Sequence, residues 1–259
     1  MTLTPSARLV HSIIATCLTE PGREESVSAS FPGTLDVEAV SYFAGLAEKV
    51  RHNGIRGDLE LTFRLLRLSG LEMELFRDYA PTSVQRRARG LTSPTERLAG
   101  LMDFVSEWAD TDEDRGLIRD VLRHEQIVAG FRRAPKLRVV DSGGPVTPES
   151  VVYLHGTVVV VDAMCDPMQV AEVLRAREPD LAAIVRRSVL MVYHRAPRGQ
   201  VRMIEVSEGV PCLLGAVDGI SDVHELGTRL LGDGATTDDV VAGYAALRDL
   251  SLVRVSPGG

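Results

Sequence analysis

The stretch of sequence that decides the fold of the second half of this chain is residues 188–206, SVLMVYHRAPRGQVRMIEV. Two runs rich in β-branched and other apolar residues, 188–194 and 201–206, flank a segment that contains Pro197 and Gly199. Runs of this length separated by turn-forming residues are typical of a β-hairpin. We therefore expect an antiparallel hairpin over these residues.

Patterns of strand and helix surround this hairpin. Residues 151–163 are rich in valine and predict a strand, and residues 166–177 predict a short helix. Three short helices are expected at 207–217, 221–231 and 236–250, followed by a short strand at 252–255. Thr236 or Thr237 can cap the last helix. A hairpin with three compact helices has the outline of a winged-helix-like module.

The first half of the chain reads as amphipathic helices. They are expected at residues 5–19, 35–50, 71–79 and 114–133, with one further helix capped by Asp58 and one that begins at Ser93. Ser93-Pro94-Thr95-Glu96 is a capping-box sequence, because Ser93 can accept from the backbone of Glu96 and Glu96 can reach back. The fold class is therefore α+β, with a helical domain at 1–140, a Gly/Pro-rich linker at 141–150 and a second domain at 151–259.

Composition restricts the function. A net charge of -7 and a content of 5% aromatic residues argue against a protein whose main role is to bind nucleic acid. No apolar run reaches the length of a membrane span, so we expect neither a nucleic-acid nor a membrane partner. Cys17, Cys165 and Cys212 are few and scattered, which favours the cytoplasm. Cys17 and Cys212 are expected in the core, and Cys165 in an exposed turn.

Motifs for catalysis are absent from the sequence. There is no P-loop and no GxSxG elbow. His124-Glu125 resembles the start of a zinc-protease helix, but Val128 occupies the second ligand position. We expect no catalytic residue and no metal ligand in this chain. Two basic clusters, Arg86-Arg87-Arg89 and Arg132-Arg133 with Lys136 and Arg138, are interpreted as solvated surface that compensates helix dipoles, with a contact patch for an acidic partner as the alternative.

Three stretches carry a resemblance to a known family. They are residues 63–81, FRLLRLSGLEMELFRDYAP; residues 117–131; and residues 188–231, in which Asp218-Gly219 forms a turn between two helices. Together they resemble the partner proteins of multinuclear non-heme iron oxidative enzymes. Those enzymes act in the maturation of ribosomally synthesised peptide natural products (RiPPs), as in methanobactin and 3-thiaglutamate biosynthesis. The last stretch resembles a RiPP recognition element.

The resemblance implies a non-catalytic subunit that forms a heterodimer with the iron-dependent oxidative enzyme and holds the leader of the precursor peptide. The iron would belong to the partner enzyme, and this chain would carry no cofactor. The leader would add as a strand beside the hairpin and lie against the last helix. The implied peptide-binding residues are Val201, Arg202, Met203, Ile204, Glu205, Val206, Val240, Tyr244 and Leu247.

Other functions remain open at this point. A winged-helix DNA-binding transcriptional regulator would share the outline of the second domain. The expected last helix, however, carries Asp238, Asp239 and Asp249 against Arg248 alone, which disfavours contact with DNA. A partner of a radical-SAM peptide-modifying enzyme would have the same module. A stand-alone enzyme would need a cluster of polar residues for which the sequence offers no candidate.

Overall fold

A computed structural model of the chain describes residues 36–134, 143–195, 200–230 and 236–256, together with Thr16 and Ala29. The protein is α+β, as the sequence predicts. Its described residues form two compact units. The first holds the described residues up to Glu125 together with Val170–Ala183, and the second holds those of Gln126–Gln169 and Ile184–Gly259. The domain limits 1–140, 141–150 and 151–259 stay a prediction, and the helix expected at 5–19 lies almost wholly outside the described residues.

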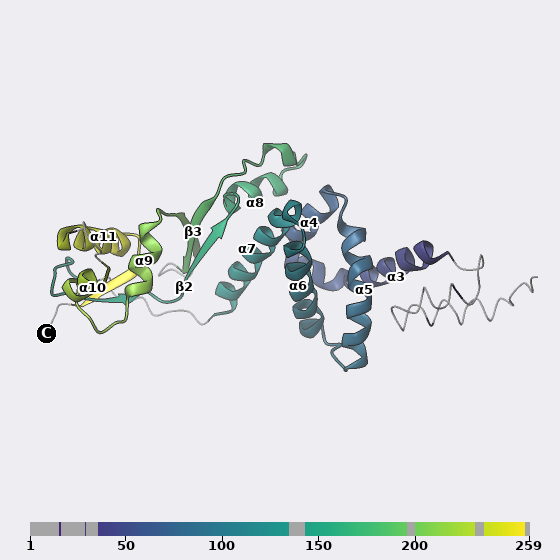
Figure 1. Ribbon diagram of the computed structural model, residues 1–259, viewed down its shortest axis with the longest axis horizontal. Helices are drawn as coiled ribbons and strands as arrows, with labels where there is room; N and C mark the ends of the chain where they lie inside the picture. Colours follow the sequence, from purple (N-terminus) through teal and green to yellow (C-terminus); the bar gives the residue numbers. More distant parts are fainter. Residues whose placement is uncertain are drawn as a thin grey trace, which may run out of the picture. The chain divides into compact units, whose positions relative to one another are not determined.

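The first unit consists of helices, and Figure 1 shows those up to residue 133 in purple to teal. In chain order they are α3 (Val37–Arg51), a 3-10 helix (Asn53–Leu59), α4 (Glu60–Leu68), α5 (Glu72–Ala88), α6 (Pro94–Asp110), a short 3-10 turn (Glu113–Arg115) and α7 (Gly116–Arg133). α7 supplies its residues up to Glu125 to this unit and the rest to the second. The capping box at the start of α6 is confirmed, with the Glu96 backbone N–H donating to Oγ of Ser93 and Glu96 accepting from the Ser93 backbone.

The start of α4 differs from the prediction. Asp58 lies inside the 3-10 helix and does not cap α4, whose first residue follows Leu59. The cap comes instead from Glu125, far along the chain. Its carboxylate accepts from the backbone N–H of Leu61 at 2.8 Å, and from the backbone N–H and hydroxyl of Thr62 at 2.9 and 2.7 Å. A carboxylate placed there satisfies N–H groups that a helix start leaves without partners.

The core of the first unit is rich in aromatic side chains. The buried rings of Phe63 and Phe76 stack with centroids 5.8 Å apart, and Tyr79 meets His52 edge-on at 5.3 Å. α3 packs closely on α5 because position 45 is glycine. A Cβ added to Gly45 would lie 2.9 Å from the backbone nitrogen of Arg77, closer than side chains normally approach. The apolar pattern of residues 63–79 therefore describes a core.

The second unit contains two small antiparallel sheets. Residues 151–163, predicted as one strand, form two: β1 (Val151–Leu154) and β2 (Val158–Ala163). Gly156 separates them with a φ of 84°, a conformation that glycine adopts readily. β1 pairs with β5 (Val253–Ser256), whereas β2 belongs to a sheet of order β2-β3-β4. The expected hairpin is confirmed as β3 (Val189–Arg195) and β4 (Val201–Glu205).

Helices make up the remaining described elements. α8 (Pro167–Arg175) and a 3-10 turn (Leu181–Ala183) follow β2 in the chain, and their residues from Val170 onward belong to the first unit. The three helices expected after the hairpin are present as α9 (Gly209–Ala216), α10 (Val223–Leu230) and α11 (Thr237–Asp249). Thr236 is the N-cap of α11, in a capping box with Asp239.

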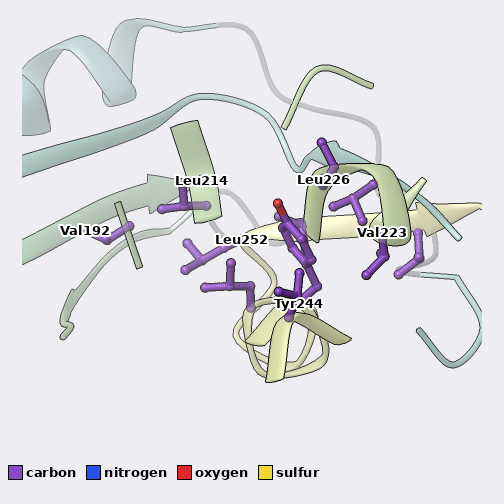
Figure 2. Close-up of a cluster of buried hydrophobic side chains, with 11 residues drawn as sticks. Val192, Leu214, Val223, Leu226, Tyr244 and Leu252 are labelled. Atoms are coloured by element: carbon purple, nitrogen blue, oxygen red, sulfur yellow. The ribbon is translucent and has the colours of Figure 1, made fainter. Parts of the chain in front are cut away.

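Both faces of the three-stranded sheet are covered. On one face Val161, Met191 and Tyr193 pack with Phe131 of α7. On the other face Val192 joins a core that β1, β5 and the last three helices share, with Leu214, Val223, Leu226, Tyr244 and Leu252 among its members; Figure 2 shows this core. Side chains that alternate along one strand reach opposite faces, so β3 contributes to both cores.

Three expectations about single residues are wrong. Cys212 is exposed and not in the core, whereas Cys165 is buried and not in an exposed turn. Arg86 and Arg87 are half-buried and bonded within the unit: Arg86 donates to the carbonyl of Glu96 at 2.9 Å. The run around Arg86 is therefore not simply a solvated surface. None of the helices in the described ranges has both the length and the apolar character of a bilayer span.

Candidate functional site

β4 is an edge strand. Within the described part of the chain it pairs with β3 alone, so one side of its backbone has no partner strand there. A free strand edge presents a row of N–H and C=O groups that another extended chain can pair with. The resemblance described above implies that a peptide binds at this edge.

The register shows which residues point their backbone groups outward. The backbone N–H of Val206 donates to the carbonyl of Leu190 at 2.9 Å. Antiparallel strands alternate hydrogen-bonded and non-hydrogen-bonded pairs. Ile204 lies opposite Val192, and Arg202 lies opposite His194, so the backbone groups of Ile204 and Arg202 form hydrogen bonds with β3. The outward-facing groups belong to the residues in between, which are Val201, Met203 and Glu205.

The residues of β4 whose backbone groups face outward are not all residues whose side chains are exposed. Val201 and Met203 are partly buried against the core that contains Phe131. Arg202 and Glu205 are exposed, and Ile204 is half-buried. Val206 lies just after the strand and packs against the core that contains Tyr244. A peptide added at this edge would therefore be held by backbone hydrogen bonds, with selectivity left to the neighbouring exposed side chains.

An ion pair lies at the end of the β4 edge. The guanidinium of Arg187 donates to both carboxylate oxygens of Glu205 at 2.6 Å, in a bidentate arrangement. This arrangement lowers the pKa of Glu205, mainly through the hydrogen bonds from Arg187. Both side chains are about half exposed, so the pair adds little stability but fixes the position of two charges beside the edge.

The structure places the three predicted residues of α11 in the core. Val240, Tyr244 and Leu247 are 4%, 0% and 1% exposed. The hydroxyl of Tyr244 donates to the carbonyl of Leu213 at 3.0 Å, and burial raises the pKa of Tyr244 to about 12. α11 packs on α9, α10 and β5. The structure therefore does not bring these three side chains together with the open edge of β4, and the peptide-binding role of all nine residues stays a prediction.

Two buried histidines were not singled out by the sequence. His194 on β3 is fully buried, and neither of its ring nitrogens has a hydrogen-bond partner; Nδ1 of the buried His155 also has none. Burial, together with the positive charges of Arg202 and His155, lowers the pKa of His194 to about 4. The ring of His194 is therefore uncharged at neutral pH. No signal in the sequence distinguishes a buried histidine on a strand from an exposed one.

Other candidate sites resolve into structural contacts. His124 is buried, and Glu125 caps α4, so the zinc-protease-like fragment belongs to the packing of the first unit. In the ranges that the structure describes, no group of three or more His, Cys, Asp or Glu side chains could hold a metal ion.

Comparison with known proteins finds no family model that matches this chain and no curated protein that matches its sequence.

Proposed function

We propose that this chain is a non-catalytic partner subunit that binds the leader of a ribosomally synthesised precursor peptide and presents it to an iron-dependent oxidative maturation enzyme. The observation that carries the proposal is the open edge of β4, with the backbone groups of Val201, Met203 and Glu205 directed away from β3. The second unit would then act as a winged-helix-like recognition module. The resemblance of residues 188–231 to a RiPP recognition element supports the same assignment.

A second surface supports the docking of a partner enzyme on the first unit. Along α3 the side chains of Tyr42, Phe43, Leu46 and Val50 are 55%, 53%, 39% and 61% exposed. Their spacing of one, three and four residues places them on one face of the helix. Exposed apolar patches on soluble proteins commonly mark interaction surfaces. The proposed partner would cover this face.

The contribution of such a subunit is position rather than chemistry. Backbone pairing along β4 tolerates many leader sequences, while Arg202 and Glu205 can select among them by charge. A leader held on the subunit raises the effective concentration of the attached core peptide at the enzyme. The oxidation itself and the iron centre belong to the partner enzyme in this proposal.

The experiment that tests the proposal is affinity purification of the tagged full-length chain from cells that express it with the neighbouring genes of its native genome. Mass spectrometry identifies the proteins and peptides that co-purify, and metal analysis measures their iron. The proposal expects an iron-containing enzyme and a short gene-encoded peptide in stoichiometric amounts. A matched purification uses Glu205→Pro, which removes an outward N–H, and should lose the peptide while it keeps the enzyme.

Other outcomes assign other functions. Recovery of a radical-SAM enzyme would keep the leader-binding role and replace the partner. Recovery of specific DNA, with no peptide, would contradict the proposal and favour a transcriptional regulator. Equal recovery of the same peptide by the wild type and by Glu205→Pro would show that β4 is not the binding edge.

A further inference from the structure

A pocket of about 240 Å³ lies in the first unit, where the 3-10 helix Asn53–Leu59 meets α4. Its lining consists of Asn53, Arg56, Gly57, Glu60, Phe63 and Arg67. All six residues belong to the first unit, whereas β4 belongs to the second. The pocket therefore belongs to a different unit from the proposed peptide-binding edge, and the function proposed above does not use it.

Arg56 is held firmly in the wall of this pocket. One amino group of its guanidinium donates to Oδ1 of Asn53 at 2.9 Å, and the other pairs with the buried carboxylate of Glu72. The guanidinium carbon also lies 5.0 Å from the ring centre of Phe63. Three partners thus fix the guanidinium plane before any ligand arrives, which reduces the entropy that a ligand must overcome on binding.

Positive charge is in excess around the pocket. Lys49 and Arg56 both pair with Glu72, with Nζ of Lys49 at 2.6 Å from the carboxylate. Arg67 lines the same pocket, and no carboxylate among the described residues forms an ion pair with it. Three cations, Lys49, Arg56 and Arg67, therefore stand against two carboxylates, Glu72 and Glu60. Glu60 is exposed and supplies the lining's own negative charge.

The pKa values of Lys49 and Arg56 are both lowered, as this excess of positive charge predicts. Burial lowers the pKa of Lys49, and the positive charge of Arg56 lowers it further. Burial likewise lowers the pKa of Arg56, and the positive charge of Arg67 adds to the effect. The positive charges of Lys49, Arg56 and Arg67 repel one another, and an anion between Arg56 and Arg67 would relieve the repulsion.

We propose that this pocket binds a small oxyanion, the carboxylate or phosphate group of a free small molecule, between the guanidinium groups of Arg56 and Arg67. Guanidinium groups present paired N–H donors that match the oxygen spacing of both anions. Arg67 donates its Nε–H to the carbonyl of Phe63 at 3.3 Å, which directs its stem along α4. Glu60 limits the negative charge that the site accepts.

The test is isothermal titration calorimetry on the full chain, with sodium phosphate and sodium glutarate in separate experiments. Sodium chloride holds the ionic strength constant, so that screening does not imitate binding. The wild type should give saturable binding of at least one anion. Arg67→Gln should weaken it about tenfold, the effect of one charge-assisted hydrogen bond. Glu60→Gln should strengthen it, because it removes a repulsive charge.

The controls separate a site from a general effect of net charge. Arg89→Gln changes an exposed arginine outside the lining and should leave the affinity unchanged. Arg56→Gln is less informative, because it also breaks the pair with Glu72. Tighter binding of phosphate or of glutarate assigns the natural group to that class, and either result supports the site. No saturable binding, or an equal loss in Arg89→Gln and Arg67→Gln, would overturn it.

Discussion

Nη1 of Arg87 on α5 lies 2.6 Å from Oε1 of Glu48 on α3, and Glu48 is buried. The same group of Arg87 donates to the hydroxyl of Ser83 at 2.9 Å, and that hydroxyl donates to the second carboxylate oxygen at 2.6 Å. Arg51 also pairs with Glu48. Burial alone would raise the pKa of Glu48, but the hydrogen bonds from Ser83 and Arg87 and the positive charges hold it below its ordinary value.

Loss of Arg87 should therefore destabilise the first unit. Arg87→Gln leaves the buried carboxylate of Glu48 with fewer donors, and removal of one partner from a buried ion pair is costly. Because Ser83 and Arg51 remain, we expect a loss of about 1–3 kcal/mol in the free energy of unfolding. Urea unfolding followed by circular dichroism measures it. The neighbouring exposed Arg89→Gln should change stability by less than about 0.5 kcal/mol, and equal effects of the two would contradict the assigned contact.

Acid should destabilise the second unit through His194. Its pKa is about 4 in the folded protein and about 6.5 in the unfolded chain, so the unfolded chain binds the proton more readily between these values. Stability is therefore complete above pH 6.5 and falls as the pH drops from 6.5 towards 4, by roughly 3 kcal/mol in total. His194→Leu should flatten the dependence of the urea midpoint on pH over this window. If the urea midpoint of the variant depends on pH as steeply as that of the wild type, other groups, such as His52, cause the effect.

A matched pair of glycines tests the close approach of α3 and α5. Gly45→Ala places a methyl group 2.9 Å from the Arg77 backbone nitrogen, and that atom cannot rotate away. We expect a loss of about 1–3 kcal/mol in thermal or urea unfolding. Gly130→Ala in α7 meets no atom within 4 Å and should instead stabilise by up to about 1 kcal/mol, because alanine favours the helix. Stabilisation by both would show that the helices do not cross so closely.

Proline substitutions test the open edge of β4. Glu205→Pro removes an N–H that points away from β3, so the fold should survive while peptide capture falls at least tenfold. Glu205→Ala breaks the same ion pair with Arg187 but keeps the N–H, so it should lose much less capture than Glu205→Pro. Ile204→Pro removes an N–H that the register directs towards β3 and should destabilise the hairpin itself.

The opposite edge of the same sheet provides the control for these variants. β2 also pairs with β3 alone among the described residues, and the register directs the N–H of Asp162 outward. Asp162→Pro should leave peptide capture unchanged, measured by the same purification with circular dichroism to confirm folding. Loss of capture in Asp162→Pro, but not in Glu205→Pro, would move the binding edge from β4 to β2.

Local sequence signals predicted the parts of the fold that depend on nearby residues. Ser93 and Glu96 lie three residues apart, so this capping box could be read from the chain, whereas the cap of the last helix stayed open between Thr236 and Thr237. The hairpin followed from two apolar runs and a turn. Asp58 failed as a cap because Glu125, distant in sequence, supplies the carboxylate to α4. Contacts of this kind depend on tertiary packing, which one sequence does not display.

The candidate site was likewise predicted only in part. The sequence identified β4 as a strand but could not tell which of its residues direct their N–H groups outward, because that depends on the register with β3. Tyr244 and Val240 lie one turn apart on an apolar stripe, and such a stripe indicates burial without naming the partner. No sequence motif indicates the pocket around Arg56 and Arg67. Its excess of positive charge arises only when the fold brings Lys49 and Glu72 beside these residues.

The open edge of β4 also affects the protein in the absence of any peptide. A backbone that accepts one extended chain accepts another, including the β4 strand of a second molecule. Self-association and peptide occupancy therefore compete for the same hydrogen-bonding groups. The apparent affinity for a peptide should weaken as the protein concentration rises, and added peptide should dissociate oligomers that form through this strand.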